Sequence, residues 1–340
     1  CTVNDSLQLG EHVESYIPQP QSIEDTELTM NFLSNLALKL IYYKSELTSA
    51  EIAETLALPF GGIVELVMQF LKRENLVEIT GSMGFGETGY QWVITGKGSD
   101  RAVRALERDR YIGPAPVPLP RYCEMVRRQS LGDLRVGPAG VQEALSHLVL
   151  PQELLNKIGP AVNSGRALFL YGPPGNGKTA IAASIIRMLK GTVYLPCAIA
   201  VDGQIIRLYD AVNHVRADDP PDKMQNTRNI ANGNGRLDRR WLRIRRPEII
   251  VGGELVMESL DLAYDPISKT YEAPFQMKAN TGLFVVDDFG RQTMRPQDLL
   301  NRWIVPLEER VDYLTLQTGQ KIEIPFDQLT VFATNLDPRE

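Results

Sequence analysis

The sequence lacks the features of a membrane-spanning, secreted or disulfide-linked protein. No apolar run approaches the roughly 18 residues of a membrane-spanning helix, and no basic segment followed by an apolar one opens the chain. Its three cysteines, Cys1, Cys123 and Cys197, lie far apart without metal-ligand spacing, which indicates reduced thiols. We therefore expect a cytoplasmic protein with no membrane insertion.

The sequence also lacks internal repeats and low-complexity tracts. Its 340 residues, of which 43% are hydrophobic, suffice for two domains with a sizeable core. Acidic residues are concentrated at the front: residues 1–110 contain 16 Asp or Glu against 9 Lys or Arg. This part of the chain is therefore poorly suited to attracting a polyanion.

A glycine-rich turn between an apolar run and an expected helix is the strongest signal in the sequence. The turn fits the pattern G-x-x-x-x-G-K-[ST] and consists of Gly172, Pro173, Pro174, Gly175, Asn176, Gly177, Lys178 and Thr179. Its glycines let backbone N–H groups bind phosphate oxygens, and the positive end of a helix over 179–190 adds to that field. Lys178 is expected to reach the β- and γ-phosphates and Thr179 to bind Mg²⁺, with Ala180 completing the nucleotide site.

Two further apolar segments end in polar residues that suit this chemistry. Leu283 to Val286 reads as a buried parallel strand, and it is followed by Asp287 and Asp288. Asp287 is expected to hold Mg²⁺ and Asp288 to orient or deprotonate the attacking water, although the pair could instead cap a helix. Asn335 ends a third strand, where it would bind the γ-phosphate or the water, or simply form a turn.

In order and approximate spacing, these segments resemble the Walker A, Walker B and sensor 1 elements of AAA+ ATPases over residues 141–340. The segment 271–282 resembles the MoxR-like, chelatase-like and enhancer-binding branch. The whole chain resembles bacterial predicted ATPases with chaperone activity that are associated with Flp pilus assembly. The resemblance implies an α/β fold, a three-layer αβα P-loop domain with a parallel sheet, and Mg²⁺-dependent ATP hydrolysis by a homo-oligomer, most often a hexameric ring.

The sequence departs from the family pattern at two points. The second acidic residue is usually Glu, whereas here it is Asp288, one methylene shorter, so slow hydrolysis or a nucleotide-gated scaffold is also open. The family's arginine finger and helical lid would follow residue 340, and Arg302 and Arg310 are the remaining intersubunit candidates. GTP is disfavoured because the Asn156-Lys157 pair lacks the Asp of a guanine-reading motif.

Residues 28–110 are expected to form an α+β winged helix-turn-helix domain after an acidic, extended or poorly ordered tail over 1–27. A helical apolar stripe begins near Phe32, and Thr48 to Glu51 is a capping box for a second helix. A third helix is expected over 61–74, followed by strands over 76–80 and 90–95 around a glycine-rich loop, and a helix over 99–109.

The third helix of a DNA-reading winged helix carries basic or amide side chains on its outward face. Here that face offers Glu65, Gln69, Lys72, Arg73 and Glu74. Together with the acidic front of the chain, this composition favours docking to a protein client, or plain scaffold use, over nucleic-acid binding. A DNA-associated ATPase stays the alternative.

A Pro-rich linker is expected over 111–140, extended and semi-rigid, before the ATPase domain. Inside that domain, the sequence predicts a strand over 194–200, a short helix over 205–213 that projects toward a ring pore, and a hairpin over 260–276. An arginine-rich run over 228–246 could contact nucleic acid or an acidic client, or could form a subunit-facing or solvated surface.

Overall fold

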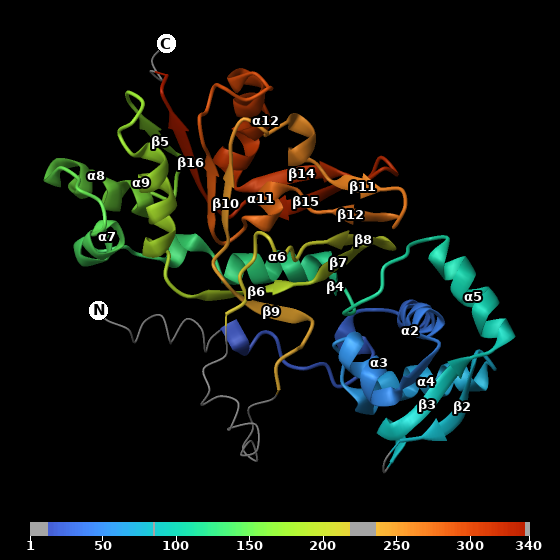
Figure 1. Ribbon diagram of the computed structural model, residues 1–340. Helices are drawn as coiled ribbons and strands as arrows, with labels where there is room; N and C mark the ends of the chain where they lie inside the picture. The colour runs from blue at the N-terminus through green and yellow to red at the C-terminus, as the bar shows by residue number, and fades with distance from the viewer. Residues whose placement is uncertain (1–12, 84–85, 218–235, 337–340) are drawn as a thin grey trace.

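The computed structural model describes residues 13–83, 86–217 and 236–336. The first body contains three helices, a three-stranded sheet and a closing helix (Figure 1). These elements are α2 (Met30–Lys44), α3 (Ser49–Thr55), α4 (Glu65–Arg73), the sheet β1 (Glu46–Thr48), β3 (Tyr90–Ile94) and β2 (Val77–Ser82) in that order, and α5 (Gly96–Leu106). The expected helices and the two strands β2 and β3 are all present, with ends that differ by up to four residues from the expected ones; the closing helix, for example, begins at Gly96 and not at residue 99.

Local sequence explains where these helices begin. The capping box forms, because Thr48 accepts the backbone N–H of Glu51 while the Glu51 carboxylate accepts the backbone N–H of Thr48 at 2.8 Å. The third helix was expected from about residue 61, but regular α4 begins at Glu65. The reason is Gly62, whose φ of +79° interrupts the helical backbone.

The second body is built on a parallel sheet of four strands. In spatial order they are β10 (Glu248–Val251), β13 (Leu283–Val286), β16 (Leu329–Thr334) and β5 (Leu168–Tyr171). β13 is buried along its whole length, which confirms the buried parallel strand expected there. β10 was not predicted, since four residues after an arginine-rich run give no periodicity to recognise.

Helices cover both faces of this sheet. On one face α7 (Pro138–Leu145), α8 (Gln152–Asn163) and α9 (Lys178–Ile185) pack on residues such as Val285. On the other face α12 (Pro296–Glu309) packs through fully buried Trp303 against Phe284 and Phe332. This is the three-layer αβα arrangement that the sequence predicts (Figure 1).

A second, mixed sheet is attached to the first. Its strands in order are β11 (Ala263–Asp265), β12 (Thr270–Glu272), β8 (Gln204–Arg207), β7 (Ala198–Val201) and β4 (Val117–Pro118). Beside it lie α6 (Leu119–Arg128), α11 (Phe275–Lys278) and the strand pairs β6 (Thr192–Pro196) with β9 (Trp241–Arg245) and β14 (Val311–Thr315) with β15 (Lys321–Pro325).

The mixed sheet tests several expectations. The hairpin is confirmed as β11 with β12, and the strand over 194–200 forms but divides into β6 and β7 at Cys197. The helix expected over 205–213 is wrong, because its first residues form β8, whose buried Ile205 and Ile206 lie between β7 and β12. β-branched side chains favour a pleated, packed strand over a projecting helix.

The expected tail and linker are folded onto the second body where they are described. Ile17 is fully buried against Val117 and Trp241, and Pro18 bridges to Leu237, so residues 13–27 are not an extended tail. Residues 1–12 lie outside the described residues. Residues 111–118 are extended, but they contribute β4 to the mixed sheet, and the rest of the linker expected over 111–140 contains α6 and the start of α7.

The arginines over 228–246 were expected to form one exposed surface, and the described ones do not. Arg240 is 1% exposed and forms an ion pair with Asp238 at 2.8 Å, while it also donates to the Thr26 carbonyl at 3.0 Å. Arg246 donates to the Thr281 carbonyl at 2.6 Å, and burial lowers its pKa to about 10. These two arginines join elements within the chain, and Arg228 lies outside the described residues.

A buried histidine adds pH dependence to the junction of the two sheets. His214 is 1% exposed; its Nδ1 accepts the Asp210 N–H at 2.9 Å and its Nε2 lies 3.0 Å from the Lys278 carbonyl. That pattern fits the neutral ring with the proton on Nε2. Burial lowers the pKa of His214 below its ordinary value of 6.5.

Because the folded state binds a proton on His214 less readily than the unfolded state, stability is expected to fall as pH drops below 6.5. One proton contributes at most about 1.4 kcal/mol per pH unit. Urea unfolding at pH 7.5, 6.5 and 5.5 measures this loss. His214→Gln should flatten the slope, and an unchanged slope in that variant would contradict the assignment.

Among the described residues, no single helix is long and apolar enough to cross a membrane. Ser49–Thr55 and Phe60–Arg73 have the length and apolar composition of a membrane span only when they are taken together, and a 79° bend separates them. Most apolar residues of that pair belong to the core of the first body, whereas Leu66 is exposed.

Candidate active site

The glycine-rich turn joins β5 to α9 at the carboxyl edge of the parallel sheet. Gly175 and Gly177 have φ of +84° and +70°, and an added Cβ at either would meet nothing within 4 Å. Glycine is therefore suited to these two positions by backbone conformation, not by lack of space. Except for half-buried Gly172 and Lys178, residues 172–180 are exposed, including Pro173, Pro174, Asn176 and Ala180.

Lys178 lies across the mouth of the turn with its ammonium hydrogen-bonded. Its Nζ donates to the carbonyls of Gly172 at 2.9 Å and Pro173 at 3.0 Å, and to Oδ1 of Asn335 at 2.6 Å. An ammonium has three donors, so these three acceptors use all of them. Phosphate oxygens entering the turn would have to replace one or more of these acceptors.

Thr179 and Asp287 meet although they are 108 residues apart in sequence. The Thr179 hydroxyl donates toward Asp287, with distances of 2.9 Å to Oδ2 and 3.1 Å to Oδ1. A hydroxyl beside a carboxylate at the edge of a phosphate-binding turn suits Mg²⁺, which takes few protein ligands and completes its shell with phosphate and water oxygens. Among the described residues no group of three His, Cys, Asp or Glu gathers in metal-binding geometry, so a dedicated all-protein cage is not seen there.

Asn335 lies between Asp288 and Lys178. The Asn335 Nδ2 lies 3.5 Å from Oδ1 of Asp288, at the outer limit of a hydrogen bond, while its Oδ1 accepts from Lys178. Asn335 follows β16, between the turn-bearing β5 and the acidic β13, as the sequence predicts. The five polar residues expected at the site therefore lie together.

One residue that shapes the site was missed by the sequence reasoning. The Gln292 side chain donates to the carbonyls of Asp287 at 2.9 Å and Asp288 at 3.2 Å, and accepts the Gly290 N–H at 2.8 Å. It thereby holds the turn in which Asp288 adopts a φ of +49°. No motif marks this glutamine, so only the fold reveals its position.

The two arginine candidates are both engaged within the chain. Arg302 pairs with buried Asp312 at 2.6 Å and with Asp261 at 3.4 Å. Arg310 donates to the Gln328 carbonyl at 3.1 Å, at the amino end of β16. Neither contact joins these arginines to the glycine-rich turn.

Comparisons with known proteins give short or low-scoring matches, and no family model matches the chain. A 50-residue stretch is 44% identical to the vesicle-fusing ATPase of Dictyostelium discoideum; it covers 15% of this chain and 6% of that protein.

Two solved structures align over more of the chain. NtrX from Brucella abortus aligns at a TM-score of 0.31 with 11% identity, over 58% of this chain and 33% of that one. A complex of the magnesium chelatase subunits BchI and BchD aligns at 0.30 with 17% identity, over 61% and 55%. Scores of this size decide nothing about the fold, which rests on the strand order and layers described above.

Proposed function

We propose that this chain is a Mg²⁺-dependent ATPase of the AAA+ type. The observation that carries the proposal is the meeting of three distant segments: Thr179 bonds to Asp287, and Lys178 bonds to Asn335. A glycine turn formed by chance does not require an amide from the neighbouring strand β16 and a carboxylate from β13, the strand beyond it. The similarity of 50 residues to a vesicle-fusing ATPase supports the same chemistry.

Each residue of the site has a role in binding or hydrolysing ATP that follows from its position. Backbone N–H groups of the turn and Lys178 bind the phosphates, while Thr179 and Asp287 hold the metal side of the nucleotide. Mg²⁺, when bound, supplies neutralisation of charge on the phosphate oxygens. Asp288 accepts the proton of the attacking water and Asn335 orients that water or the γ-phosphate. Catalysis rests on positioning and charge, with no covalent intermediate.

The activity we propose is the remodelling or assembly of a protein client by a homo-oligomer, a hexameric ring, in a setting such as pilus assembly. Arg302 and Arg310 are occupied within their own chain, so the site needs an arginine from another segment or subunit to neutralise the transferred phosphoryl group. Contacts of the γ-phosphate would then be coupled to movement between subunits.

Asp288→Asn tests the catalytic assignment. The amide keeps the shape of the side chain but cannot accept the proton, so phosphate release should fall by roughly 10²-fold or more while ATP binding persists. Asp100→Asn, on the exposed surface of α5, is the matched control and should leave the rate unchanged. Equal phosphate release in wild type and Asp288→Asn would remove Asp288 from the mechanism.

A DNA-associated ATPase is the second candidate, and the observation that favours it is the pair Lys72 and Arg73 at the exposed end of α4. In that case a labelled random duplex should bind with an affinity that falls steeply with salt. Absence of binding at low salt, together with ATP-dependent capture of a protein, would exclude it.

A further inference from the structure

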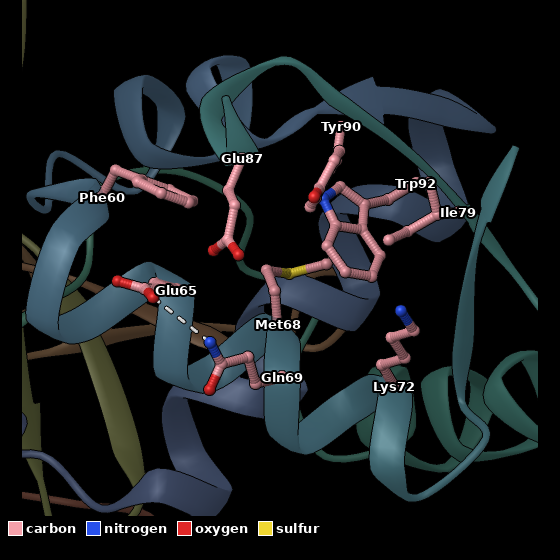
Figure 2. Close-up of a pocket in the computed structure, with 9 residues that line it drawn as sticks. All are labelled: Phe60, Glu65, Met68, Gln69, Lys72, Ile79, Glu87, Tyr90 and Trp92. Atoms are coloured by element: carbon pink, nitrogen blue, oxygen red, sulfur yellow. Dashed lines mark hydrogen bonds between the residues drawn. The ribbon is translucent and has the colours of Figure 1, made fainter. Parts of the chain in front are cut away.

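A cavity of about 170 Å³ lies in the first body between α4 and the wing, which consists of β2, Glu87–Gly89 and β3 (Figure 2). None of its lining residues belongs to the glycine-rich turn. An engineered cavity of about 150 Å³ accepts a molecule the size of benzene, so this one accommodates the end of one side chain. Its lining combines aromatic, sulfur and acidic groups and consists of Phe60, Glu65, Met68, Gln69, Lys72, Ile79, Glu87, Tyr90 and Trp92.

The floor of this cavity is apolar and fixed. Met68 is 1% exposed and Trp92 is 4% exposed. The Trp92 indole N–H donates to Ser49 at 2.8 Å, and the Tyr90 ring stands edge to face against it with centroids 6.3 Å apart. Since the N–H is already bonded to Ser49, the part of the indole that lines the cavity is apolar.

The mouth of the cavity carries two carboxylates from separate elements. Glu65 belongs to the first turn of α4, where its Oε1 accepts from Gln69 at 3.2 Å, and Glu87 reaches over Met68 from the wing (Figure 2). Glu87 is exposed, and within the described residues its carboxylate makes no ion pair. Lys72 is the one cation among the lining residues.

The backbone conformation at two glycines of the wing determines where Glu87 lies. Gly86 has a φ of +81°, and a Cβ at Gly89 would lie 2.4 Å from the Met83 carbonyl. Only glycine fits the second position without a backbone shift, and this close approach folds the loop back so that Glu87 faces α4. Gly86 and Gly89, two glycines of the loop noted in the sequence, therefore shape the cavity.

We propose that this cavity binds a lysine or arginine side chain of a protein partner. The aliphatic stem of such a side chain covers the Met68 and Trp92 floor, and its charged end lies between Glu65 and Glu87. A DNA phosphate at the same mouth would meet two carboxylates against the single ammonium of Lys72, so the balance of charge repels it. The cavity occupies the face of α4 and the wing that a DNA-reading protein of this shape would use, so it assigns that face to a basic peptide segment.

The probes are capped tripeptides Gly-Lys-Gly and Gly-Arg-Gly added to the 340-residue chain, with Gly-Gln-Gly as the neutral control. The readout is the NMR signal of the Trp92 indole N–H, identified by its loss in Trp92→Phe. Saturable shifts with the basic peptides that weaken as salt rises are expected. Equal shifts with Gly-Gln-Gly, or no saturable shift with either basic peptide, would overturn the proposal.

Variants separate the charges from the shape of the cavity. The double variant Glu65→Gln, Glu87→Gln keeps both side-chain volumes, and its affinity for the basic peptides should fall by about tenfold or more. Glu78→Gln removes an exposed carboxylate from β2 outside the lining and should change the affinity by less than about twofold. Unchanged binding in the double variant would refute the role of the two carboxylates.

The proposal fails or succeeds separately from the ATPase assignment. Phosphate release should persist in the Glu65→Gln, Glu87→Gln variant, and peptide binding should persist in Lys178→Ala. A labelled duplex that displaces Gly-Lys-Gly from the Trp92 site would instead assign this face to nucleic acid and overturn the proposal.

Discussion

Lys178→Ala is expected to lower the rate of phosphate release by roughly 10²- to 10³-fold, the effect of removing one preorganised donor from a transition state. In the structure its ammonium donates to the Gly172 and Pro173 carbonyls and to Asn335. Those acceptors show where a phosphoryl oxygen would receive the same hydrogen bonds. Alanine leaves the turn without its side-chain cation, so nucleotide affinity should fall too.

Lys190→Ala is the matched control for this prediction. Lys190 is exposed and pairs with Glu143 at 2.7 Å, beyond the end of α9, so its removal should leave phosphate release unchanged. The measurement is phosphate release at saturating Mg²⁺ and ATP, with circular dichroism to establish that both variants fold. Phosphate release by Lys178→Ala at the wild-type rate would contradict the assignment of the turn.

Asp238→Ala is expected to destabilise the chain by about 3–5 kcal/mol, the cost of leaving a buried cation without its partner. Both side chains of the Asp238–Arg240 pair are 1% exposed. Arg240 also donates to the carbonyl of Thr26, so the ion pair helps to hold the front segment and β9 together. Without the carboxylate, a guanidinium that does not lose its proton stays buried.

An exposed ion pair is the control for the buried one. Asp298 pairs with Arg295 at the start of α12, where the arginine is 79% exposed, and Asp298→Ala should shift the urea midpoint far less than Asp238→Ala does. The shift in urea midpoint measures both variants. Equal shifts would mean that the Asp238–Arg240 pair does not stabilise the fold. The double variant Asp238→Leu, Arg240→Met should recover much of the loss, because it removes both charges.

The sequence predicts the parts of this protein that depend on local patterns. The residues of the turn, β13 and the capping box at Thr48 follow from glycine spacing, a short buried run and a polar pair three residues apart. The position of Asn335 beside the turn was expected, because carboxyl ends of neighbouring parallel strands meet at one edge, but its hydrogen bond with Lys178 was not.

Other features depend on distant partners and leave no local pattern. β8 was mistaken for a helix because its burial between β7 and β12 is decided by strands far along the chain. Arg240 looks like a surface charge in sequence, and only its contacts with Asp238 and the Thr26 carbonyl reveal an internal role. Gln292 donates to a backbone carbonyl, that of Asp287. Every residue has a backbone carbonyl, so no residue type in the sequence marks the partner of Gln292.

The central claim is that a triphosphate binds in the Gly172–Thr179 turn with its metal between Thr179 and Asp287. A crystal structure of the chain with Mg²⁺ and a non-hydrolysable ATP analogue tests it most directly. We expect the γ-phosphate against Lys178, with at least one of the present lysine acceptors displaced, and the metal next to Thr179. A nucleotide bound elsewhere, with the contact between Lys178 and Asn335 intact, would contradict the claim.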